Sequence, residues 1–155
     1  MSERSIDKPL YEQDFARWAE DQSRALREAA AASLNATLDW ENLAEEIESL
    51  GRSQRRELGS RILVIVEHLM KLQASPARAP RRGWQATVLH ERAMVRRLLQ
   101  DSPSLRGAVP ELIADALPDA RRVVERELAR RREANRTLLA LEYASDQVVG
   151  DWLPD

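Results

Sequence analysis

The stretch that decides the fold is residues 40–74, WENLAEEIESLGRSQRRELGSRILVIVEHLMKLQA. Its apolar side chains recur every three or four residues, so they share one face of a helix: Leu43, Ile47, Leu50, Leu58, Ile62, Ile65, Leu69 and Leu72, with Gln54 in the same row. This period predicts an amphipathic helix of 35 residues, which would be about 52 Å long at 1.5 Å per residue. Gly51 interrupts the row and permits a kink, but we expect the helix to be continuous.

Residues 62–72 carry apolar side chains on more than one face, which places this half of the helix in the core. The same period predicts further helices at residues 10–32, 84–101 and 119–135. Asp39 can cap the helix at 40–74, and Pro76 and Pro80 end it. The helix at 84–101 should then return antiparallel, forming a central hairpin. The tail is apolar enough to pack back in an ordered form: Leu138, Leu139, Leu141, Tyr143, Val148, Val149, Trp152 and Leu153.

Length and composition predict an all-α helical bundle in a single domain, residues 1–155. Alanine, leucine, glutamate and arginine dominate, which favours helix nearly everywhere. The absence of cysteine excludes disulfides and thiolate sites and suits a reducing cytoplasm. No apolar run approaches the roughly 20 residues of a membrane span, and the N-terminus lacks a signal-peptide pattern. We therefore expect a cytoplasmic protein.

The net charge of −2 is unevenly distributed. Residues 1–51 carry 5 Lys/Arg and 12 Asp/Glu, residues 52–106 carry 12 and 4, and residues 107–155 carry 7 and 10. Such blocks can attract one another within a fold, attract a second copy head-to-tail, or attract a charged ligand. The pattern leaves these three alternatives open.

Several motifs carry a family resemblance. The most specific is residues 38–53, LDWENLAEEIESLGRS, and others are YEQDF at 11–15, EHLMK at 67–71, DSPSL at 101–105 and DWLP at 151–154. In this order they resemble the bacterial family known as domain of unknown function 29. The resemblance implies a compact, all-helical bacterial domain and no particular reaction. The chain departs from the family's pattern at His90-Glu91, where Glu-Gln is more usual.

An acidic cluster opens the helix at 40–74. Glu41, Glu45 and Glu48 are spaced four and three residues apart, so they share a face. Carboxylates at this end complement the helix dipole and keep the outer surface soluble. They could also bind a basic partner or, as a weaker alternative, a metal.

Two His/Glu pairs lie at equal distances from the loop between the second and third predicted helices. An antiparallel hairpin would bring Glu67-His68 and His90-Glu91 to similar heights. They could form a hydrogen-bonded pair between helices, bind a divalent cation or exchange protons. Glu91 also lies on the apolar face of its helix, where an arginine partner is expected; Arg55, Arg56 and Arg61 of the preceding helix are the candidates.

The loop before the third predicted helix is basic. Arg78, Arg81 and Arg82 precede Trp84, and this combination could meet phosphates while the indole stacks on a base. Further cations lie nearby in the sequence: Lys71, Arg92, Arg96 and Arg97. The alternative is that the arginines of the loop are simply solvated and Trp84 is buried in the core. No known nucleic-acid motif accompanies it.

No phosphate-binding glycine loop, nucleophile elbow or helical zinc-binding motif is present. The sequence thus predicts no cofactor and favours a non-enzymatic protein-interaction or regulatory module, self-associating through its opposed charge blocks. Its expected contact surfaces are the acidic start of the second helix and the basic loop. The alternatives are a nucleic-acid-binding accessory protein and a metal-dependent enzyme with a site at His68, His90, Glu67 and Glu91.

Overall fold

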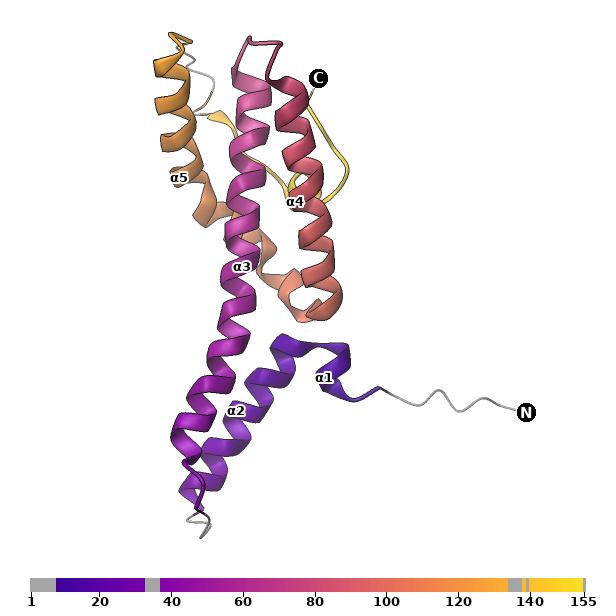
Figure 1. Cartoon of the computed structure of the whole chain (residues 1–155), viewed down its shortest axis with the longest axis vertical. Coiled ribbons are helices and arrows are strands. Elements are labelled where there is room, and N and C mark those ends of the chain that lie inside the picture. The colour runs from indigo at the N-terminus through magenta and orange to yellow at the C-terminus, as the bar shows by residue number, and fades with distance from the viewer. Residues whose placement is uncertain (1–7, 33–36, 134–137, 139, 155) are drawn as a thin grey trace, which may run out of the picture. The chain divides into compact units, whose positions relative to one another are not determined.

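The structure, a computed structural model, describes residues 8–32, 37–133, 138 and 140–154. These residues form helices and connecting segments without a strand, so the predicted all-α class is confirmed (Figure 1). The elements, in chain order, are α1 Leu10–Gln13, α2 Phe15–Ala31, α3 Trp40–Ala74, α4 Arg81–Asp101, the 3-10 helix η1 Pro103–Ala108, α5 Val109–Arg130 and α6 Ser145–Val149.

The long second helix has the predicted bounds. α3 runs unbroken from Trp40 to Ala74 through Gly51 (Figure 1). Asp39 caps it as expected, because its Oδ1 accepts a hydrogen bond from the backbone N–H of Asn42 at 3.3 Å. The glycine does not break the helix. A Cβ built on Gly51 would lie 3.3 Å from the Cβ of Ala19, so glycine serves here to let α2 approach closely.

The chain divides into two compact units, which we describe separately. The N-terminal unit comprises Met1–Arg56 and Leu98–Leu105, and the C-terminal unit comprises Glu57–Arg97 and Arg106–Asp155. The N-terminal unit contains 8 Lys/Arg and 13 Asp/Glu, a net charge of −5, and the C-terminal unit contains 16 and 13, a net charge of +3. The expectation of one domain over residues 1–155 stays a prediction.

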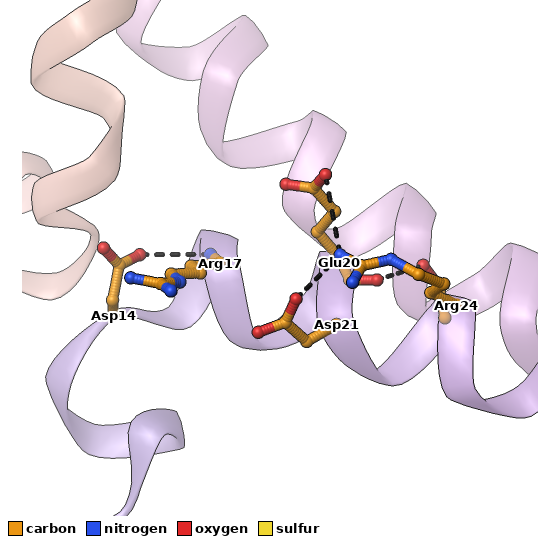
Figure 2. A network of polar contacts seen from close by, with 6 residues as sticks. Asp14, Arg17, Glu20, Asp21 and Arg24 are labelled. Atoms are coloured by element: carbon orange, nitrogen blue, oxygen red, sulfur yellow. Dashed lines mark hydrogen bonds and ion pairs between the residues drawn. The ribbon is translucent and has the colours of Figure 1, made fainter.

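The helix predicted at residues 10–32 is in fact two helices in the N-terminal unit. Asp14 separates α1 from α2 with extended backbone angles, φ −157° and ψ 93°. Its carboxylate accepts a hydrogen bond from the backbone N–H of Arg17 at 3.1 Å, which is an N-cap interaction (Figure 2). The prediction of one continuous helix was wrong because the short carboxylate of Asp14 bonds to nearby backbone and caps a new helix at this position.

The predicted apolar row of α3 is buried only in its second half. In the C-terminal unit Leu58, Ile62, Ile65 and Leu69 have no exposed surface and Leu72 is 2% exposed. In the N-terminal unit Leu43 is 40% and Leu50 51% exposed, which the sequence did not predict. The reason is size. Gly51 lies against Ala19 of α2 and Ala44 is fully buried, so the small residues face inward and the leucines beside them turn outward.

The remaining elements lie in the C-terminal unit or link the units. α4 runs antiparallel to the second half of α3, which confirms the central hairpin, but it starts at Arg81 rather than at residue 84. α5 starts ten residues before the predicted residue 119 and continues through Pro118. Burial of one face holds it together across the proline: Val109, Ile113, Ala116, Ala120, Val124 and Leu128.

α5 ends at Arg130, earlier than predicted, and the predicted end at residue 135 lies outside the described residues. The end is a Schellman motif. The N–H of Glu133 donates to Leu128 O at 2.8 Å and the N–H of Arg132 to Ala129 O at 3.0 Å. Arg132 has φ 58°, a left-handed conformation that a glycine usually adopts.

The C-terminal tail packs against the C-terminal unit, as predicted. Leu138 is 1% exposed, Tyr143 is 8% and Val148, in α6, is fully buried, whereas Trp152 is 36% exposed. The Tyr143 hydroxyl donates to Gln73 Oε1 at 2.5 Å. Leu139, also predicted in this core, lies outside the described part of the chain.

Within the segments that the structure describes, no helix combines the length and the apolar character that crossing a bilayer requires.

Candidate functional site

A pocket of about 370 Å³ opens in the N-terminal unit where α1, α2, α3 and the end of α4 meet. Its lining combines two aromatic side chains, two carboxylates and one amide: Tyr11, Glu12, Phe15, Gln54 and Asp101. None of these residues was singled out as a site residue from the sequence. The available signal was the spacing of Tyr11, Phe15 and Trp18, which places three aromatic residues on one side of the chain around the Asp14 break.

Buried polar groups hold the frame of this pocket. The Asp14 carboxylate accepts hydrogen bonds from the backbone N–H of Ser104 at 2.7 Å and from its hydroxyl at 2.9 Å. Ser102 has no exposed surface. Its hydroxyl accepts from the N–H of Ala16 at 3.1 Å and donates to Gln54 Oε1 at 3.3 Å. These bonds fix the start of α2 against α3 and η1, and they position the Gln54 side chain.

The aromatic side chains form a contiguous cluster. The ring centroids of Tyr11 and Phe15 are 5.7 Å apart and those of Tyr11 and Trp18 are 4.8 Å apart, both edge to face. Tyr11 is nevertheless 55% exposed. An aromatic ring this open offers a binding surface and adds little to the core.

An exposed apolar row leads along α3 to the pocket. Successive helical residues are rotated by about 100°, so Leu43, Ile47, Leu50 and Gln54 lie on one face. Ile47 is half-buried, whereas Leu43 and Leu50 are open to solvent. We call Leu43, Ile47 and Leu50 the apolar row. Gln54 continues it into the lining of the pocket.

The predicted acidic surface is only partly available to a partner. Glu48 pairs with Arg27 of α2 and, at 2.8 Å, with Arg52. The hydrogen bond from Arg27 is the main cause that lowers the pKa of the Glu48 carboxyl. Glu41 and Glu45 are exposed on the same side of α3 and add to the field that raises the pKa of Arg27. Glu48 therefore helps to hold α2 against α3.

Further ion pairs lie on the surface of α2. Figure 2 shows Arg24 between Asp21 and Glu20, at 2.8 Å and 4.0 Å. These groups are largely exposed, so each pair contributes little to stability. They identify this side of α2 as a solvated, charged face.

The basic loop does not offer the predicted stacking surface. Arg78 and Arg82 are exposed, but Arg81 is half-buried and donates to Leu72 O at 2.7 Å, which satisfies a carbonyl at the end of α3. Trp84 is 7% exposed, and the guanidinium of Arg131 lies 5.5 Å from its ring centroid. The indole is therefore a core side chain, as the alternative interpretation expected, and the Arg131 guanidinium already covers its face.

Arg92, expected near phosphates, has no exposed surface. Its Nε donates to Val148 O at 2.9 Å, and its Nη2 donates to Gln147 O at 2.6 Å and to Trp152 O at 2.7 Å. Burial lowers the pKa of this guanidinium. Arg92 thus anchors α6 and the tail through three backbone carbonyls and is not part of a ligand surface.

The predicted His/Glu constellation is split among other partners. His68 Nδ1 lies 2.8 Å from Val64 O of its own helix and His90 is exposed, and within the described part of the chain no hydrogen bond joins the two histidines. Glu91 Oε2 accepts from Arg61 Nη1 at 3.0 Å, which confirms the expected arginine partner. Burial lowers the pKa of His68.

Glu67, the fourth member, lies near a different ion pair. Lys71, 8% exposed, is 2.6 Å from Glu127 Oε2 of α5. Burial raises the pKa of the Glu67 carboxyl, and Lys71 opposes that shift. Among the residues that the structure describes, no three histidine, aspartate or glutamate side chains are grouped to hold a metal ion.

The fold and these sites define an all-helical protein whose charged clusters are mostly internal ion pairs. A family model described as "Domain of unknown function DUF29" matches residues 10–152, so the chain belongs to this family. An α-helical protein of unknown function from Rhodospirillum rubrum has a similar crystal structure, with a TM-score of 0.67. It is 24% identical, and the match covers 96% of this chain and 100% of that one. No curated protein matches the sequence.

Proposed function

We propose that this protein is a non-enzymatic protein-interaction module, and that the apolar row of its N-terminal unit binds a basic amphipathic helix of a partner protein. The observation that carries the proposal is the exposure of Leu43 and Leu50, two turns apart on one face of α3. Single exposed leucines are ordinary on protein surfaces. Two in register, with Ile47 between them, form the kind of stripe that a partner helix covers.

The distribution of exposed apolar side chains supports this location. Seven large apolar side chains are exposed among the described residues: Tyr11, Leu38, Leu43, Leu50, Leu89, Val123 and Trp152. The first four lie in the N-terminal unit, which is the smaller of the two. Because the smaller unit carries more of these exposed side chains, it is the better candidate for a partner interface.

Charge indicates the chemistry of the partner. The N-terminal unit has a net charge of −5. Glu46 lies between Leu43 and Leu50 on the outer flank of the apolar row, and Glu12 and Asp101 lie at its pocket end. A helix with one apolar face and lysine or arginine beside it complements this surface, and long-range attraction increases its rate of association.

The experiment is a calorimetric titration of the full chain with a designed amphipathic helix of leucine and lysine. We expect binding that weakens with salt and is lost in the Leu43→Asp/Leu50→Asp variant, because aspartate removes apolar contact and stays hydrated. Leu89→Asp is the matched control, since Leu89 is 52% exposed, as Leu50 is 51% exposed, but lies in the C-terminal unit.

Equal weakening by Leu89→Asp would show that the peptide binds nonspecifically and would contradict the proposal. Light scattering on the same variants tests whether a second copy of this chain, instead of a partner protein, covers the apolar row. A dimer that Leu43→Asp/Leu50→Asp converts to a monomer would assign the apolar row to self-association and overturn the partner helix.

A further inference from the structure

The pocket in the N-terminal unit has the composition of a cation site. Its lining offers two carboxylates, two aromatic rings and an amide, and none of the described residues that line it is a lysine, arginine or histidine. Its volume of about 370 Å³ lies at the low end of the range for ligand pockets. A small, acidic and aromatic cavity favours a compact cation that carries some apolar surface.

The two carboxylates of the lining are available to a ligand. Glu12 and Asp101 are both exposed, and no ion pair or side-chain hydrogen bond engages either of them within the described part of the chain. The neighbouring Asp14 is different, because its carboxylate already accepts three hydrogen bonds. The negative charge of the pocket is thus concentrated in the two groups without an internal role.

The rings supply a second attraction for the same kind of ligand. Tyr11 meets Phe15 and Trp18 edge to face, which fixes its orientation while 55% of its surface stays open. The face of an aromatic ring carries negative electrostatic potential and attracts ammonium and guanidinium groups. A guanidinium is planar, so it can stack on a ring while it donates hydrogen bonds to a carboxylate.

The pocket walls are fixed before a ligand binds. Ser102, fully buried, bonds to both Ala16 of α2 and Gln54 of α3, and Asp14 bonds to Ser104. Preformed walls reduce the entropy that binding would cost. The fixed amide of Gln54 adds a polar group at the junction with the apolar row.

Other ligand classes fit less well. An anion would meet two unneutralised carboxylates, and an apolar ligand would desolvate them without compensation. A divalent cation prefers at least six oxygen ligands or a close cluster of donors, and the described residues contain no group of three such side chains. An alkylguanidinium satisfies both the carboxylates and the rings.

We propose that this pocket receives the guanidinium of an arginine side chain presented by the partner. The assignment to a partner's side chain rests on the function proposed above, because Gln54 joins the pocket to Leu50 at the spacing of one helical turn. A helix lying on the apolar row can therefore place an arginine in the pocket.

The test exploits the single phenylalanine of the chain, Phe15, which lines the pocket. In full-length protein labelled with ¹³C-phenylalanine, every ring signal reports on this site. The probe is N-acetyl-arginine amide, and its neutral isostere N-acetyl-citrulline amide is the control. We expect a saturable shift of the Phe15 signals with the arginine probe, reduced by salt, and none with citrulline.

Variants distinguish binding in the pocket from nonspecific attraction to an acidic surface. Glu12→Gln/Asp101→Asn should weaken binding of the arginine probe about tenfold, the combined effect of two exposed carboxylates. Glu41→Gln/Glu45→Gln removes the same charge elsewhere in the unit and should leave binding unchanged. Equal shifts with citrulline, no shift with arginine, or equal weakening by both double variants would each overturn the proposal.

Two further comparisons identify the source of the guanidinium and keep the two proposals distinguishable. Free L-arginine binding more than tenfold tighter than the blocked probe would assign the pocket to a small molecule and overturn the partner side chain. Leu43→Asp/Leu50→Asp should abolish binding of the leucine–lysine peptide and leave the arginine titration intact. Failure of the peptide alone would thus count against the proposed function, and failure of the arginine probe alone against the pocket.

Discussion

At the scale of single residues, Arg92 is the most consequential side chain outside the pocket. It is the largest of the fully buried side chains, and three backbone carbonyls of the tail depend on it. Arg92→Leu leaves those carbonyls without a donor, so we expect a loss of about 2–4 kcal/mol in the free energy of unfolding. Urea denaturation measures this loss, and hydrogen exchange should show opening of α6.

Arg96→Leu is the matched control for Arg92→Leu. Arg96 lies one turn further along α4, its side chain is 54% exposed, and it is 3.8 Å from Asp151. A weak pair of this kind contributes less than about 1 kcal/mol. Equal destabilisation by the two variants would contradict the anchoring role of Arg92.

Glu67 gives a pH-dependent prediction. Because burial raises the pKa of its carboxyl, the folded protein keeps a proton that the unfolded chain has lost, and stability falls as pH rises through the folded pKa. The neutral isostere Glu67→Gln should therefore be more stable than wild type at neutral pH. The difference should vanish below a pH of about 4.5, the ordinary value.

Chemical denaturation across this pH range measures the effect, with Glu125→Gln on the exposed face of α5 as the control. A Glu67→Gln protein less stable than wild type at neutral pH would show that the charge of Glu67 is stabilising and would contradict this account.

The contacts of a side chain could be predicted from the sequence where its position among the apolar residues of a helix showed that it faces the core. Glu91 lies between core positions of α4, so an arginine partner was expected, and Arg61 is that partner. Arg92 follows the same logic, since it lies four residues after Val88 and three before Val95, both fully buried. Its role was missed because its partners are backbone carbonyls of the tail, and no sequence pattern marks them.

At the scale of elements, the end of α5 offers a direct test. Arg132 adopts a left-handed conformation that costs an L-residue about 1 kcal/mol, whereas glycine adopts it freely. Arg132→Gly should therefore stabilise the protein by about 1 kcal/mol, measured by thermal or urea unfolding. Arg126→Gly, at an exposed position inside α5, should destabilise it by a similar amount. Destabilisation by Arg132→Gly would show that the Schellman end is assigned incorrectly.

The positions of the helices could be predicted from the sequence better than where most of them end or which of their side chains face inward. The period of apolar residues predicted α3 with its bounds, because its cap at Asp39 and the prolines after Ala74 agree with the pattern. The pocket arises from the Asp14 break, which depends on hydrogen bonds to Ser104, ninety residues away. The exposed leucines arise from close approach at Gly51. Both depend on tertiary contacts.

At the scale of the whole molecule, α3 contributes residues to both compact units without a break. A helix is cooperative along its length, so we expect the chain to unfold in one transition. Differential scanning calorimetry should give equal calorimetric and van't Hoff enthalpies. Two resolved transitions would show that the units unfold independently and would contradict the predicted single domain.

The acidic block at residues 1–51 lies within the N-terminal unit, which is acidic overall, whereas the basic block at 52–106 and the acidic block at 107–155 lie mostly or wholly in the C-terminal unit, which is basic overall. Many of these charges are engaged within their own unit, as in Arg27 with Glu48 and Lys71 with Glu127. Net charge alone therefore did not predict which surface is open to a partner. The exposed leucines and the unengaged carboxylates of the pocket identify it more closely.

The most direct test of the proposed interaction is the map of backbone amide shifts when the leucine–lysine peptide is added to the full-length protein. We predict that the shifted amides belong to residues 11–15 and 43–54, around the pocket and the apolar row. Shifts centred on the basic loop at residues 78–82, or on the exposed surface around Leu89, would contradict the proposal.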